Sequence, residues 1–169
     1  MTYTHPEPLR GKHDLGDFGC GEERLNEWLH RYARHAEAAG SARTFVTTDL
    51  TRVVGFFSLT VGQVEPGKAT ERMLKGQPGE SPIPVLILAR LAVDSRHQGN
   101  GVGASLLQDA LLRCSAVAEV VGIRAVVAQA KQRANGFYDR WGFEASPSDP
   151  LHRILLIKDL NSWSKELEL

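Results

Sequence analysis

The sequence predicts an α/β protein with a mixed sheet flanked by helices. Residues 21–39 and 103–121 repeat apolar side chains at three- and four-residue spacing, which is typical of amphipathic helices. Residues 44–49 and 53–64 are rich in β-branched and aromatic side chains around a short turn, and predict an antiparallel hairpin. Residues 86–93 are apolar on both faces, as expected of a central strand. The two hairpin strands come before a β-α-β-α-β order, which favours a mixed sheet.

The remaining elements follow in chain order. Residues 65–84 are rich in glycine and proline and are expected to be mainly loop, with a helical turn around 70–75. Residues 124–130 predict a second buried strand, 132–141 a short helix, and 152–160 the last strand.

Length and composition favour one domain over residues 1–169, with 42% apolar and 24% charged residues. The formal net charge is zero, so a nucleic-acid partner requires a local basic patch. No apolar run is long enough to span a membrane and no apolar signal core begins the chain, so we expect a soluble, cytoplasmic protein. The two cysteines, Cys20 and Cys114, predict neither a disulfide nor a metal site, and Cys114 falls on the apolar face of a predicted helix.

The most informative stretch is R-H-Q-G-N-G-V-G, residues 96–103, between the apolar strand and the second long helix. Glycines at alternate positions let the backbone approach a ligand closely, and the helix behind them adds the positive end of its dipole. The stretch therefore predicts a seat for a pyrophosphate. Its spacing does not fit the dinucleotide loop G-x-G-x-x-G or the phosphate loop G-x-x-x-x-G-K-[ST].

Arg96-x-x-Gly99-x-Gly101 resembles instead the coenzyme A signature R/Q-x-x-G-x-G/A of the GNAT acetyltransferases. The resemblance implies the GNAT fold, a mostly antiparallel twisted sheet flanked by helices, with acetyl-CoA as cofactor. It also implies a bulge at the end of the preceding strand that frees a backbone N–H for the thioester carbonyl. The cofactor-binding residues expected on this basis are Leu91, Ala92, Val93, Arg96, Gln98, Gly99, Asn100, Gly101, Val102, Gly103 and Ala104.

A second segment, G-F-Y-D-R-W-G-F at residues 136–143, resembles the F-Y-x-x-x-G-F segment of the same family. The resemblance implies that Tyr138 is the general acid, since a phenol with a pKa near 10 is protonated at neutral pH. The alternative for Tyr138 is a core aromatic residue. The family often has an asparagine seven residues before this tyrosine, where this sequence has Lys131.

A narrower resemblance covers residues 18–150, including F-G-C-G, L-N-E-W-L, S-A-R-T-F-V, R-L-A-V and G-F-E-A-S-P-S-D-P. These segments are similar to the GNAT toxins of type II toxin–antitoxin systems. The resemblance implies acetylation of the α-amino group of aminoacyl-tRNA, a block of translation, a ribbon-helix-helix antitoxin as partner, and a homodimer. A non-toxic enzyme acting on a small amine or a protein N-terminus is an open alternative, and so is an acyl-CoA-binding module without catalysis.

The acceptor chemistry favours an α-amine. No carboxylate stands out as a strong general base, although Glu65 and Glu71 could act through water by analogy with the family. An α-amino group has a reference pKa near 8, so it needs less help to lose its proton than a lysine, whose pKa is near 10.4. For tRNA contacts we expect Arg90, Lys131, Arg133 and Arg140; Arg90 interrupts an apolar strand, and a structural ion pair is its alternative role.

Overall fold

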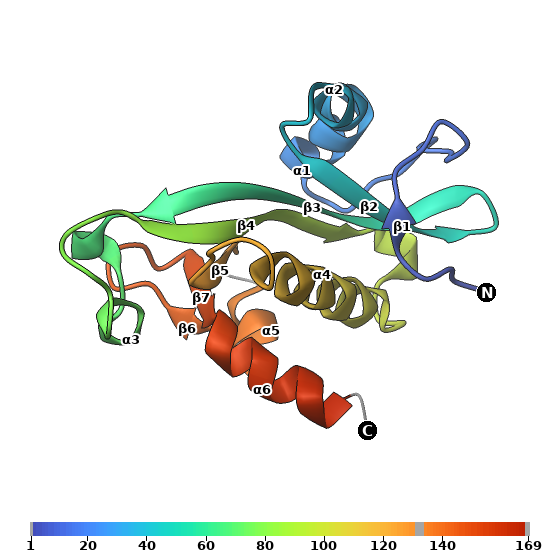
Figure 1. Ribbon diagram of the computed structural model, residues 1–169. Helices are drawn as coiled ribbons and strands as arrows, with labels where there is room; N and C mark the ends of the chain where they lie inside the picture. Colours follow the sequence, from blue (N-terminus) through green and yellow to red (C-terminus); the bar gives the residue numbers. More distant parts are fainter. Residues whose placement is uncertain (1, 131–133, 168–169) are drawn as a thin grey trace. The chain divides into compact units, whose positions relative to one another are not determined.

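The computed structural model describes residues 2–130 and 134–167 (Figure 1). Seven strands are hydrogen-bonded in the order β1-β2-β3-β4-β5-β7-β6. The pair β4–β5 is parallel, and the pairs β1–β2, β2–β3, β5–β7 and β6–β7 are antiparallel. The predicted mixed α/β class is therefore confirmed. The chain divides into two compact units, Met1–Thr60 with Ala89–Ala110, and Val61–Leu88 with Leu111–Leu169.

The first unit contains β1 (Glu7–Pro8), β2 (Arg43–Asp49) and the first part of β3 (Arg52–Val64). The β2–β3 register aligns Arg43 with Leu59 and shifts between Thr47 and Thr48. This is the predicted hairpin, and its β-branched and aromatic residues favour extended backbone. Strand β1 was not predicted, because two residues are too few to show an alternating pattern.

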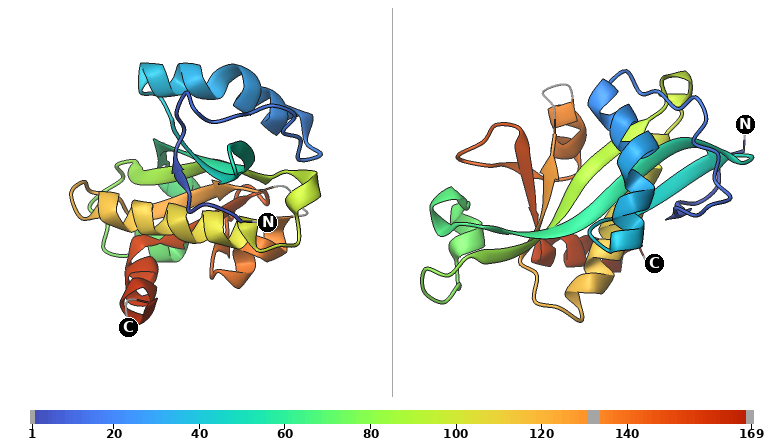
Figure 2. Two further views of the ribbon diagram at one scale, coloured as in Figure 1. Left: turned by 90° about the vertical axis from the view of Figure 1, so that its right-hand side faces the viewer. Right: turned by 90° about the horizontal axis from the view of Figure 1, so that it is seen from above.

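The predicted helix 21–39 forms α1 (Glu23–Glu27), a π-helical turn (Trp28–Tyr32) and α2 (Ala33–Ala39). Seen from above in Figure 2, this helical run crosses over β2 and β3. The sequence pattern placed Tyr32 on the apolar face, but its side chain is 51% exposed. A π-turn holds more residues per turn than an α-helix, so the apolar register shifts there.

The core beneath this helical run is apolar and aromatic. Leu29 and Ala33 pack in one buried cluster with Val46, Phe56 and Ala92. Burying a leucine or phenylalanine side chain stabilises the fold by about 1.5–3 kcal/mol. The contacts therefore fix the helical run against the strands that precede the glycine-rich loop.

The second unit contains most of β4 (Ile83–Val93), with β5 (Ala125–Gln129), β6 (Glu144–Ala145) and β7 (His152–Leu156). Its short helices are α3 (Glu71–Leu74), which matches the helical turn predicted there, and α5 (Asn135–Arg140). Arg124 donates hydrogen bonds to the carbonyl oxygens of Arg72, Met73 and Lys75, which caps the C-terminal end of α3.

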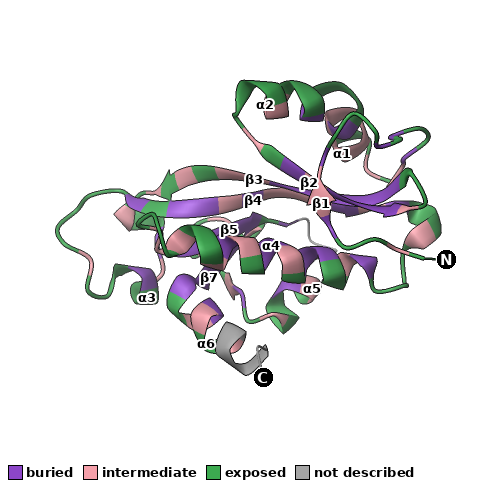
Figure 3. Ribbon diagram, turned by 45° about the vertical axis from the view of Figure 1, so that its right-hand side comes forward, coloured by how far each residue is buried: buried purple, intermediate pink, exposed green. Residues whose placement is uncertain are grey.

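Helix α4 (Val102–Ala118) is the second long helix predicted, and its buried side includes Leu107, Leu111 and Cys114 (Figure 3). The predicted last strand, 152–160, is wrong beyond Leu156, because α6 (Ile157–Leu167) begins there. Ile157 and Leu160 are both buried at helical spacing, and the polar residues between and after them disfavour a strand. Within the described residues, no helix is both long and apolar enough to cross a membrane.

Candidate active site

The glycine-rich loop lies in the first unit, between a 3₁₀ turn (Ser95–His97) and the first residue of α4. Gly99 and Gly101 adopt left-handed conformations with φ of 82° and 80°. A Cβ atom built at either glycine meets nothing within 4 Å, so a ligand can approach the backbone closely. No described acceptor takes the backbone N–H of Gly99, Asn100 or Gly101. The loop therefore presents free donors at the N-terminus of a long helix, as an anion requires.

A buried carboxylate holds the start of this loop. Asp94 is 1% exposed and accepts hydrogen bonds from the Arg96 backbone N–H (2.9 Å), the Arg96 Nε (3.0 Å) and the Gly19 N–H (3.1 Å). Burial alone would raise the pKa of Asp94, but the hydrogen bonds from Arg96 and Gly19 outweigh it and lower the pKa to about 2. The sequence reasoning missed Asp94; the signal was a carboxylate directly after an apolar strand and two residues before Arg96.

The Arg96 side chain completes this set of hydrogen bonds around Asp94, which we call the clamp. Its Nη1 donates to the Asp17 carboxylate at 2.9 Å, and its Nη2 donates to Asp94 at 3.0 Å. The guanidinium is thus committed to two carboxylates, and these hydrogen bonds raise the pKa of Arg96. A cofactor contact from Arg96 stays a prediction, whereas its role in fixing the loop follows from these contacts.

A cavity of about 220 Å³ opens beside the loop within the same unit. It is lined by Tyr3, Thr4, His5, Thr47, Asn100, Gly101, Val102 and Ser105. The Thr47 hydroxyl is buried and has no hydrogen-bond partner among the described residues. The Tyr3 hydroxyl and the His97 Nδ1 are 3.0 Å apart, which connects the N-terminal segment to the loop. Nothing in the sequence pattern indicated this connection.

Residues Leu91–Val93 end β4 next to the loop. Ala92 is buried, and Leu91 and Val93 are half-buried. The Val93 carbonyl accepts a hydrogen bond of 3.0 Å from the Gln98 side chain, which ties the strand end to the loop. The bulge implied by the family resemblance stays a prediction.

Arg90, two residues before Ala92, is half-buried in the first unit. Its guanidinium carbon lies 3.9 Å from the ring centroid of Trp28, and its Nη1 donates to the Ser58 hydroxyl at 3.4 Å. Burial lowers the pKa of Arg90. No carboxylate of the described residues forms a salt bridge with Arg90, so the alternative of a structural ion pair has no partner there. The expected tRNA contact stays a prediction.

Tyr138 belongs to the second unit, on α5. It is 4% exposed and packs edge-on against Phe137 and Phe143, with ring centroids 5.2 and 5.3 Å away. Burial raises the pKa of its phenol, so the hydroxyl keeps its proton at neutral pH. Its assignment as the general acid stays a prediction.

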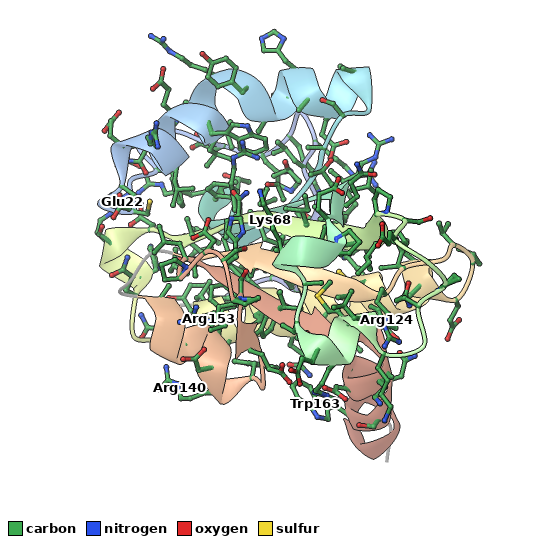
Figure 4. All side chains as sticks on the ribbon, turned by 90° about the vertical axis from the view of Figure 1, so that its left-hand side faces the viewer. Glu22, Lys68, Arg124, Arg140, Arg153 and Trp163 are labelled. Atoms are coloured by element: carbon green, nitrogen blue, oxygen red, sulfur yellow. The ribbon has the colours of Figure 1, made fainter. Side chains whose placement is uncertain are left out.

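Of the other residues expected to contact tRNA, Lys131 and Arg133 lie outside the described residues. Arg140 is exposed at the end of α5 (Figure 4). Arg153, also labelled there, pairs with Asp139 at 2.8 Å and fixes the same helix to β7. Among the described residues, no cluster of histidine, cysteine or carboxylate side chains could hold a metal ion.

The loop fits the pyrophosphate of acetyl-CoA. Its two left-handed glycines leave open space, its N–H groups are unpaired in the described chain, and α4 adds its positive dipole end. The unpaired donors of the described loop are the backbone N–H groups of Gly99, Asn100 and Gly101. Binding of the pyrophosphate by Gln98 to Gly103 stays a prediction.

Comparison with known proteins agrees with this geometry. Residues 40–145 match the acetyltransferase (GNAT) domain. The chain is 40% identical over 158 residues to a tRNA-acetylating toxin of Mycobacterium tuberculosis (strain ATCC 25618 / H37Rv), covering 93% of this chain and 94% of that protein.

Two solved structures are also similar. AtaT complexed with acetyl-methionyl-tRNAfMet is 26% identical, with a TM-score of 0.86 and coverage of 96% of this chain and 99% of AtaT. A mutant AtaT toxin bound to the C-terminus of the antitoxin AtaR is 25% identical, with a TM-score of 0.81 and coverage of 95% and 97%. The chain therefore belongs to the GNAT family of acetyltransferases, enzymes that take their acetyl group from acetyl-CoA.

Proposed function

We propose that this protein is a toxin that acetylates the α-amino group of aminoacyl-tRNA and thereby blocks translation. The observation that carries the proposal is the 40% identity, over 93% of this chain, to a tRNA-acetylating toxin. The AtaT complex with acetyl-methionyl-tRNAfMet supports the same chemistry, because the molecule bound there is an aminoacyl-tRNA that carries an acetyl group.

Acetyl-CoA supplies an activated acetyl thioester when bound. The backbone N–H groups of Gln98–Gly103 would bind its pyrophosphate, and a backbone N–H at the strand end Leu91–Val93 would donate to the thioester carbonyl. The acceptor amine must be neutral to attack that carbonyl, and an α-amine with a pKa near 8 is partly neutral at physiological pH. As the carbon–nitrogen bond forms and the carbon–sulfur bond breaks, the Tyr138 hydroxyl would donate its proton to the leaving thiolate. The proton that the amine releases would pass through water back to the Tyr138 oxygen, which restores the acid. The raised pKa of Tyr138 supports a donor that stays protonated until this step.

The tRNA is held by a local basic patch, since the formal net charge of the chain is zero. We assign this patch to Arg90, Lys131, Arg133 and Arg140. The protein acts in the cytoplasm as a homodimer, and a ribbon-helix-helix antitoxin neutralises it. The structure of AtaT bound to the antitoxin AtaR supports an antitoxin as the partner.

The test is incubation of the protein with labelled acetyl-CoA and total charged tRNA. We expect label on the α-amine of one or more aminoacyl-tRNAs, and growth arrest when the protein is produced without its antitoxin. Label that appears on a polyamine or a peptide N-terminus, and on no aminoacyl-tRNA, would establish the non-toxic acetyltransferase instead.

A further inference from the structure

Arg90 is a half-buried cation that lacks an anion among the described residues. Its guanidinium carbon lies over the Trp28 ring, 3.9 Å from the centroid, and its one described hydrogen bond, to the Ser58 hydroxyl, is long at 3.4 Å. A guanidinium carries five N–H donors, so most of the donors of Arg90 remain available within the described chain.

Other arginines of the described chain satisfy their charge differently. Arg153, which is buried, pairs with the Asp139 carboxylate at 2.8 Å, and Arg124, which is half-buried, donates hydrogen bonds to three backbone carbonyl oxygens. Removing a charge from water without compensation is costly, so arginines that lose solvent gain a carboxylate partner or several hydrogen-bond acceptors. Arg90 loses solvent and gains, from the described residues, only an aromatic face and a weak hydrogen bond, which indicates that a ligand supplies its anion.

The position of Arg90 indicates which ligand this is. It precedes Leu91–Val93 directly on β4, and one strand residue advances about 3.3 Å, so an anion bound there lies within roughly 10 Å of the strand end. Alternation along the strand puts Arg90 on the face of Ala92, which packs in the cluster beneath the helical run that carries Trp28. Trp28 also begins the π-helical turn, a local geometry that is frequent at functional sites.

We propose that Arg90, held on the face of Trp28, binds a backbone phosphate at the acceptor end of the charged tRNA, an inference that rests on the proposed function. A planar guanidinium can donate two parallel hydrogen bonds to a phosphate, and the contact with Trp28 restrains it in advance. Binding the phosphate next to the strand end places the aminoacyl group of the terminal nucleotide beside Leu91–Val93. Arg90 is thus a substrate-binding residue that distinguishes RNA-linked amines from free amines.

The test compares Arg90→Gln and Arg90→Lys with a matched control, Arg52→Gln. Arg52 is exposed in the same unit, at the start of β3, and six strand residues, about 20 Å, separate it from Ser58. Steady-state kinetics are measured with charged tRNA and with a free aminoacyl amide as acceptors. Melting temperature and acetyl-CoA affinity confirm that each variant is folded.

We expect Arg90→Gln to raise KM for charged tRNA by about 10- to 100-fold with kcat little changed, the range expected for a hydrogen-bonded charge. Arg90→Lys keeps the positive charge but cannot donate two parallel hydrogen bonds to one phosphate. Its KM for charged tRNA should therefore lie between those of wild type and Arg90→Gln. The aminoacyl amide should react equally well with all variants, and Arg52→Gln should match wild type on both acceptors.

Equal KM values for Arg90→Gln and Arg52→Gln on charged tRNA would overturn the inference. A parallel loss with the aminoacyl amide would also overturn it, since Arg90 would then support the site and not the RNA. If Arg90→Gln raises KM only for tRNAs charged with acidic amino acids, Arg90 binds the side-chain carboxylate of the amino acid and not a phosphate, which would also overturn the inference. If wild type itself acetylates no aminoacyl-tRNA, the proposed function is wrong and the inference fails with it. That result differs from a failure of the inference alone, in which wild type acetylates charged tRNA and Arg90→Gln does so equally well.

Discussion

Replacing Asp94 by asparagine tests the clamp that fixes the cofactor loop. The substitution keeps the shape of the side chain and removes its charge, so the hydrogen bonds from Arg96 and Gly19 lose their ionic acceptor. The pKa of Asp94 falls from an ordinary 3.8 to about 2 in the fold. Because a tenfold change in an equilibrium constant corresponds to about 1.4 kcal/mol, the charge stabilises the fold by about 2.5 kcal/mol.

We therefore expect Asp94→Asn to lower the free energy of unfolding by about 2–3 kcal/mol and the melting temperature by about 5–10 °C. The matched control is Asp17→Asn, which removes the exposed partner of the same guanidinium. Exposed pairs are screened by solvent, so the control should melt close to wild type. Calorimetry should also show weaker acetyl-CoA binding by Asp94→Asn than by Asp17→Asn, because only Asp94 anchors the loop from the buried side.

The pH dependence makes this reasoning refutable. The pKa of Asp94 is lower in the folded state than in the unfolded state, so its carboxylate stabilises the fold above about pH 4 and loses that effect as the pH falls through 2. In chemical denaturation, the difference in free energy of unfolding between wild type and Asp94→Asn should therefore shrink as the pH falls from about 4 to about 2. A gap that is absent at pH 7, or that is unchanged between pH 4 and pH 2, would refute the buried-carboxylate argument.

Three further predictions concern the proposed reaction. Gly101 has a backbone φ of 80° that favours glycine, and Gly101→Trp should abolish acetyl-CoA binding in calorimetry. The control Gly11→Trp, also in open surroundings, should bind acetyl-CoA normally. Unchanged affinity in a folded Gly101→Trp variant would contradict the placement of the pyrophosphate. Tyr138→Phe should melt and bind acetyl-CoA like wild type and lose about 10²- to 10⁴-fold in turnover, measured where chemistry limits the rate; a loss of less than about twofold would remove Tyr138 from the reaction. Acetylation of charged tRNA should fall steeply between low and moderate salt, by roughly one log unit of affinity per tenfold salt for each phosphate contact, while acetylation of a free amine changes little; equal salt dependence would exclude a phosphate-binding patch.

Much of the architecture followed from local pattern. Apolar spacing located the helices 21–39 and 103–121, and β-branched runs located the hairpin and the two central strands, because periodicity reports directly which face is buried. The pattern failed where local signals are short or altered by packing. Strand β1 has two residues, the π-helical turn moved Tyr32 into solvent, and the segment after Leu156 turned out to be helix α6.

The glycine-rich loop could be located from the sequence alone, since its glycines and the helix behind it are adjacent along the chain, whereas its binding of the cofactor stays a prediction. Family resemblance in the same residues determined the class of chemistry, and the comparisons confirmed it. Tertiary structure decided which partners these residues have. Asp94 accepts a hydrogen bond from Gly19, which is 75 residues away in the sequence. Arg90 donates one to Ser58, 32 residues away, and its guanidinium lies over the ring of Trp28. Such contacts depend on strand pairing and helix packing between segments far apart in the chain, and a linear pattern of residue types does not encode them.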